Sequence, residues 1–125
     1  MKAVTLIARI LLGLAFVVFG ANILHPFLPM PKEPPPPLAG DFAKALMVSH
    51  YMLVVGALQL IGGLLLLIGR YVPLGLTLLG PVVVNILLFH LFLAPQGLPI
   101  ALVVGVLSLF LLWQYRDAFR GLLRP

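Results

Sequence analysis

The hydrophobic positions of this chain fall into four long runs, separated by short segments rich in proline, glycine or basic residues. The clearest run lies between Pro73 and Pro95 and contains no charged residue. An α-helix rises about 1.5 Å per residue, so about 20 apolar residues cross the hydrocarbon core of a bilayer. The runs therefore predict membrane spans at about residues 4–24, 45–68, 73–93 and 98–115. We expect an all-α fold, a four-transmembrane-helix bundle that forms one domain over residues 1–125.

Composition supports an integral membrane protein. The chain is 62% hydrophobic and 9% charged, whereas about 25% of the residues in a soluble domain are charged. Mean hydropathy is +1.20, so the lipid bilayer is the expected surrounding. The net charge of +5 is spread over the span ends, a distribution that sets orientation and argues against nucleic-acid binding. With no cysteine in the sequence, the chain cannot carry out thiol–disulfide chemistry itself.

The connection between the first two spans is rich in proline. The run Pro34–Pro37 favours polyproline II over helix, and predicts an extended loop over residues 25–40. Such a loop is either a stiff connector or a strap that docks a partner. Asp41, which follows the loop, is expected to cap the amino end of the second helix. We expect the first span to be retained, because its apolar run is longer than that of a signal peptide.

Lysine and arginine predict the orientation. Six lie on one side of the predicted bundle (Lys2, Arg9, Arg70, Arg116, Arg120 and Arg124) and two on the other (Lys32 and Lys44). This bias predicts a multi-pass protein with both termini in the cytoplasm and the proline-rich loop outside. The residues expected at the membrane interface are Arg9, Arg70, Tyr71, Trp113, Tyr115 and Arg116. Arg9 either extends to the phosphate headgroups or turns inward to a polar partner.

Uncharged polar residues within the spans are the candidates for function, because lipid does not satisfy their hydrogen bonds. The candidate ligand-binding set is Asn22, Gln59, Thr77, Asn85 and His90. Gly56, Gln59 and Gly63 share a helix face, so Gln59 is expected to face the bundle. Thr77, Pro81 and Asn85 also share a face, at a proline that is expected to kink the helix. Two interpretations stay open: Asn85 pairs with Gln59 and fixes the packing, or the set forms a small polar pocket.

Three histidines raise the alternative of a haem or metal protein. The candidate ligands are His25, His50 and His90, since two imidazoles on facing helices can hold a haem. Against this, His50 points away from Gln59 on the helical wheel, His25 adjoins Pro26, and no carboxylate lies within a span to orient an imidazole. A small transporter is a further alternative, although Arg9 is the sole charge within a span.

Several segments together resemble the DoxX family of bacterial membrane proteins. They are Gly13–Gly20 with Asn22, Gln59–Arg70, Pro81–His90 and Tyr115–Asp117. The resemblance implies a four-helix inner-membrane protein, some of whose relatives belong to quinone-linked thiosulfate oxidation and oxidative-stress complexes. It implies no single reaction. Many family members carry an acidic residue at the position of Gln59, and an amide there can bind a ligand but cannot titrate.

Together these observations predict a non-catalytic subunit, or a binder of a quinone-like molecule, associated with a membrane redox complex. The expected partners are the other subunits of such a complex or a second copy of the chain; the small-residue faces of the helices suit packing within one bundle or a homodimer equally. A quinone is the expected small molecule, because amide and imidazole groups in an apolar cleft can hydrogen-bond its carbonyls.

Overall fold

The computed structural model describes residues 2–29 and 33–123, and every secondary-structure element within these ranges is helical. The long helices are α1 (Lys2–Leu24), α3 (Tyr51–Ile68), α4 (Val72–Phe92) and α5 (Leu98–Gln114), the last preceded by the short 3₁₀ turn η1 (Pro95–Gly97). Four helical segments are long and apolar enough to cross a membrane, which confirms the predicted all-α protein with four spans. The shorter elements are α2 (Pro37–Val48) and the 3₁₀ tail η2 (Arg116–Leu123).

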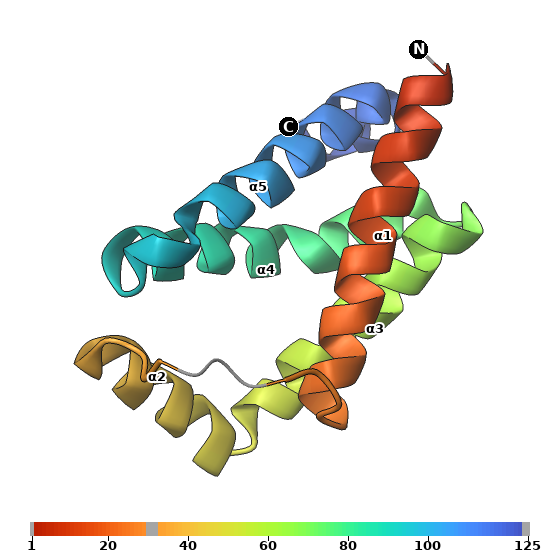
Figure 1. Ribbon diagram of the computed structural model, residues 1–125. Helices are drawn as coiled ribbons and strands as arrows, with labels where there is room; N and C mark the ends of the chain where they lie inside the picture. The colour runs from red at the N-terminus through yellow and green to blue at the C-terminus, as the bar shows by residue number, and fades with distance from the viewer. Residues whose placement is uncertain (1, 30–32, 124–125) are drawn as a thin grey trace.

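The four long helices form two pairs. α1 packs along α3 and α4 packs along α5; the pairs are joined by an α3–α4 contact at least as extensive as that of α4 with α5, and by a smaller contact of α5 with α1. Figure 1 shows the pairs meeting where α1 starts and α5 ends, and diverging toward the other end, where α2 lies. We call the meeting point the basic end, because Lys2, Arg9, Arg70 and Arg116 lie there. Its assignment to the cytoplasm stays a prediction, and Lys32 and Arg124 lie outside the described residues.

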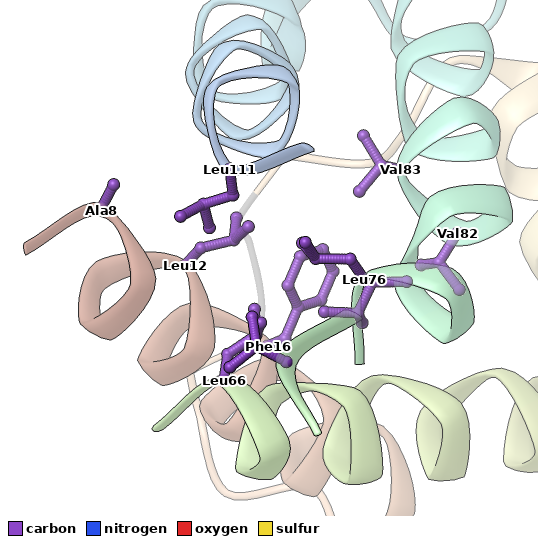
Figure 2. Packing of buried hydrophobic residues seen from close by; sticks show 10 residues of the cluster. Ala8, Leu12, Phe16, Leu66, Leu76, Val82, Val83 and Leu111 are labelled. Atoms are coloured by element: carbon purple, nitrogen blue, oxygen red, sulfur yellow. The ribbon is translucent and has the colours of Figure 1, made fainter. Parts of the chain in front are cut away.

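The hydrophobic core lies toward the basic end. Its buried members come from all four long helices: Ala8, Leu12, Phe16, Leu66, Val72, Leu76, Leu79, Val82, Val83 and Leu111. Figure 2 shows Leu111 of α5 beside Leu12 of α1, with Phe16 close to Leu66 of α3 and Leu76 of α4. This cluster fixes the two pairs relative to each other at that end.

Glycines bring α1 and α3 into backbone contact. A Cβ atom added at Gly63 would lie 2.8 Å from the Gly13 carbonyl oxygen, and one added at Gly20 would lie 2.7 Å from the Leu60 nitrogen. Real Cβ atoms do not approach backbone atoms so closely, so any side chain at these positions would push the helices apart. Small residues are the expected means of helix association in lipid, where burying apolar surface gains little.

The second predicted span was wrong at its start. The chain forms a separate helix, α2, and the span begins at Tyr51 instead of residue 45. His50 separates the two helices in a left-handed conformation (φ 64°), which histidine adopts more readily than most residues. The Ser49 hydroxyl accepts from the Tyr51 N–H at 3.3 Å and donates to the Leu46 carbonyl at 3.3 Å. These local hydrogen bonds replace helical ones and so favour the break.

Two predictions about the proline-rich loop also need correction. An extended loop was predicted over residues 25–40, yet α2 starts at Pro37, with Pro36 as its N-cap. Proline suits the first helical position because its fixed φ is helical and the missing N–H would have no partner there. Asp41 therefore lies inside α2, exposed, and is not the predicted cap. With 12 residues, α2 is too short to span a bilayer. It touches the rest of the bundle through α3 and a ring contact between Phe42 and Phe89.

Candidate functional site

Gln59 is the most deeply placed of the predicted site residues. It lies on α3 with only 5% of its surface exposed, and its Cβ is 3.1 Å from where a Cβ at Gly20 of α1 would be. The prediction that Gln59 faces the bundle is therefore confirmed. Among the hydrogen bonds of residues 2–29 and 33–123, none involves its amide group. Its amide atoms are not among the buried side-chain atoms without a partner, so the amide end reaches the edge of the α1–α3 interface and can bind another group there.

Thr77 and Asn85 share a face of α4, as predicted, but that face points outward. Both residues are exposed, and with Pro81 they form what we call the α4 stripe. The Thr77 hydroxyl donates to the Pro73 carbonyl and the Asn85 Nδ2 donates to the Pro81 carbonyl, both at 2.8 Å. Asn85 therefore does not pair with Gln59, so the first of the two interpretations left open by the sequence is wrong.

The reason is that the inner face of α4 is already filled by apolar residues. The buried residues of α4 are Val72, Gly75, Leu76, Leu79, Val82 and Val83. The polar side chains on the opposite face reduce their cost in lipid by bonding to the carbonyl four residues earlier. Ser108 of α5 makes the same type of bond to Val104.

Asn22 holds the end of α1. Its side-chain oxygen accepts the backbone N–H groups of Phe27 and Leu28, each at 2.9 Å. Pro26 lies within this turn and has no N–H of its own, so the Asn22 oxygen closes the chain reversal across it. These two hydrogen bonds satisfy the side-chain oxygen of Asn22, so it needs no ligand.

His90 lies in the last turn of α4 and packs against neighbouring residues there. Its Nδ1 lies 2.9 Å from the Ile86 carbonyl oxygen, and its ring meets the Phe89 ring edge-on, with 5.1 Å between centroids. Because a carbonyl only accepts hydrogen bonds, this contact places the ring proton on Nδ1. The ring also packs so closely on Gly97 of η1 that a side chain at residue 97 would collide with it.

The predicted set is therefore not brought together in one pocket. Gln59 lies between α1 and α3, the α4 stripe faces outward, and His90 packs on η1. His25 and His50 are exposed. Within the described ranges, no group of three or more His, Cys, Asp or Glu side chains is placed to hold a metal ion.

A cleft that the sequence did not predict opens at the basic end. Its volume is about 380 Å³, and its lining residues come from the start of α1 and the end of α5: Lys2, Thr5, Leu6, Arg9, Gln114 and Tyr115. Tyr115 was expected only as an interface residue, and Arg9 either as an interface residue or as an inward-facing partner of a polar group. The available signal was that polar residues occur in the first turns of the first span and the last turn of the fourth, two regions that an up-and-down bundle brings together.

The other predicted interface residues gather around this end. Tyr71 is 70% exposed and Trp113 is 63% exposed. The Arg116 guanidinium lies 4.3 Å from the centre of the Trp113 ring and donates to the Trp113 carbonyl at 2.8 Å. Aromatic and basic side chains of this kind are typical of the headgroup level of a membrane.

Comparison with known proteins agrees with this architecture. The model of the DoxX family matches residues 4–92, which cover α1 to α4 and more than half of the chain. Comparison with curated proteins and with solved structures gives no match. The match includes the glycine contacts of α1 with α3 and the α4 stripe. The chain is a multi-pass membrane protein that belongs to the DoxX family.

Proposed function

We propose that the protein is a non-catalytic subunit of a membrane redox complex, and that the α4 stripe is the surface that contacts the partner subunit. The observation that carries the proposal is the exposure of Thr77, Pro81 and Asn85 on one face of a membrane-spanning helix. Polar groups on such a face are costly in lipid and are expected to meet a partner.

The α4 stripe has hydrogen-bond donors and acceptors that its own helix does not use. The Asn85 amide uses one N–H on Pro81, which leaves its oxygen and its second N–H. Proline has no backbone N–H, so Pro81 cannot bond to the Thr77 carbonyl four residues earlier. A donor and an acceptor from a partner helix would satisfy both positions, as interhelical hydrogen bonds do in membranes.

The chemistry of the chain supports a subunit without its own reaction. The sequence has no cysteine, and its three carboxylates (Glu33, Asp41 and Asp117) all lie outside the four spans. Gln59 is buried but cannot exchange a proton. The link to redox complexes comes from the family resemblance, and the location in a bacterial inner membrane belongs to the same proposal.

A quinone-like ligand at the same stripe is a second candidate. The outward direction of Asn85 gives a lipid-soluble molecule lateral access from the bilayer. The free Asn85 N–H can donate to a quinone carbonyl, and the Thr77 carbonyl can accept from a quinol hydroxyl. A partner subunit and a quinone would therefore either compete for this face of α4 or bind to it together. In this arrangement Asn22, Gln59 and His90 would not contact the quinone.

The test compares tagged wild type with Asn85→Leu after extraction into native lipid nanodiscs. We expect wild type to co-purify with an oxidoreductase, identified by mass and by the visible absorption of its flavin, haem or iron–sulfur group. Asn85→Leu should weaken this association by about three- to fifteen-fold, the range for one interhelical hydrogen bond. Leu102→Ala, an exposed position on α5, is the control and should retain the partner.

Lipid extraction from the same nanodiscs decides the second candidate. A quinone held in fixed ratio by wild type and lost from Asn85→Leu would favour ligand binding at the stripe. Equal partner and equal quinone content in wild type and Asn85→Leu would refute both functions of this face.

A further inference from the structure

The cleft at the basic end combines two cations with neutral polar groups. Lys2 and Arg9 supply the charge, Thr5 and Tyr115 supply hydroxyls, and Gln114 supplies an amide. None of the residues lining this cleft is acidic. Within residues 2–29 and 33–123, the ion pair formed is Arg120 with Asp117 at 2.9 Å, so neither cation of the cleft is neutralised by a described carboxylate. The cleft is therefore electrostatically suited to an anion.

Arg9 is held in place for such a ligand. Its guanidinium lies against Gly69, where an added Cβ would be 2.7 Å from Nη1. Gly69 ends α3 in a left-handed conformation (φ 79°) and presents no side chain to the guanidinium. The Arg9 Nε is buried and has no hydrogen-bond partner in the described part of the chain. A buried donor without an acceptor is uncommon in proteins and needs a physical explanation; a bound anion that draws the guanidinium toward the cleft would supply one.

The level of the cleft in the membrane indicates which anion is available to bind in it. It lies at the ends of two membrane-spanning helices, at the same end as Trp113 and Arg116. At this level of a bilayer the abundant anion is the phosphate of a lipid headgroup, which arginine binds through charge-assisted hydrogen bonds. We propose that the cleft lined by Lys2, Thr5, Arg9, Gln114 and Tyr115 binds the phosphate of an anionic phospholipid, such as phosphatidylglycerol.

Such a lipid would connect the first and last spanning helices. α1 and α5 contact each other less extensively than the sequential pairs do, and the cleft lies between their ends. A headgroup bound to Lys2 and Arg9 of α1 and to Gln114 and Tyr115 of α5 would close the bundle at the basic end. This role is independent of the α4 stripe and of any redox partner.

The experiment measures lipid binding to the full chain in detergent by native mass spectrometry, with phosphatidylglycerol and phosphatidylcholine as probes. We expect wild type to prefer phosphatidylglycerol. Arg9→Gln and Lys2→Gln should each weaken its binding by about fivefold, the effect of one basic residue near an anionic membrane surface. Lys2 is exposed, so Lys2→Gln tests the proposal even if Arg9→Gln impairs folding. Arg120→Gln removes the same charge outside the cleft and should change binding by less than twofold.

A third arm separates a lipid headgroup from a free anion. Inorganic phosphate, added at millimolar concentration to protein in phosphatidylcholine, should not reproduce the thermal stabilisation given by phosphatidylglycerol. Equal stabilisation by inorganic phosphate would overturn the assignment to lipid. Equal affinity for the two lipids, or an equal loss of binding in Arg120→Gln and Lys2→Gln, would overturn the site itself.

Discussion

The α1–α3 interface and the outer face of α4 are built from equally apolar spans but behave in opposite ways. At the interface, Gly13, Gly20 and Gly63 bring the helices so close that no side chain fits between the backbones. On α4, the stripe of Thr77, Pro81 and Asn85 stays exposed, with its side-chain donors bonded to its own helix. The difference indicates that, within a membrane, close packing and not polarity selects which face of a helix is buried against another helix.

The largest effect is expected from removing a core side chain where the helix pairs meet. Leu66 is fully buried, so Leu66→Ala should lower the free energy of unfolding by about 2–4 kcal/mol, through lost contacts and the cavity left behind. Leu64→Ala on the same helix is the control, because Leu64 is 40% exposed and lipid can fill the space. Unfolding in mixed micelles measures both. Equal losses would mean that the core of the bundle lies elsewhere.

A smaller loss is expected from adding one methyl group to the glycine contact. In Gly63→Ala the new Cβ would lie 2.8 Å from both the Gly13 oxygen and the Val17 nitrogen. Two backbones must then separate, at a cost of about 1–3 kcal/mol. Gly80→Ala is the matched control, because nothing lies within 4 Å of a Cβ at that position of α4. Its stability should be unchanged or slightly raised by the better helix propensity of alanine.

The sequence predicted correctly which residues share a helix face, because helix spacing determines this. It did not predict the direction of each face, because tertiary contacts determine that. Gln59 was predicted correctly to face the bundle, because Gly56 and Gly63 on the same face marked the side that a second helix approaches. The same reasoning placed Thr77 and Asn85 together but gave the wrong direction. Spacing shows which residues share a face, and only packing shows where that face points.

The helix break at His50 and the cleft at the basic end were not predicted from the sequence, for a related reason. An apolar run gives no sign of a single left-handed residue, and α2 starts within a proline run that seemed to exclude helix. The cleft joins residues from the two ends of the chain. The polar residues at these ends were visible in the sequence, but the contact of α5 with α1 is what shows that they line one cleft.

Gln59→Leu tests whether the amide of this buried residue is needed for packing. Leucine has nearly the same volume, and the amide has no hydrogen bond within the described residues that the change would break. Stability in mixed micelles should therefore stay equal or rise by up to about 1 kcal/mol, since a polar group at the edge of the interface is replaced by an apolar one. A clear loss would show that the Gln59 amide bonds to a ligand or to a second chain. Gln59→Glu should lower stability, because it adds a buried charge.

The smallest effect on stability is expected at the α4 stripe. Asn85 contributes to no buried contact of the isolated chain, and its hydrogen bond is to its own helix. Asn85→Leu should change the free energy of unfolding of the purified chain by less than about 0.5 kcal/mol. The same substitution is expected to weaken association with a partner several-fold. A variant that keeps the stability of the chain but loses the partner assigns Asn85 to recognition. If the isolated chain loses stability instead, Asn85 belongs to the packing of the bundle, and the contrast between the two helix faces fails.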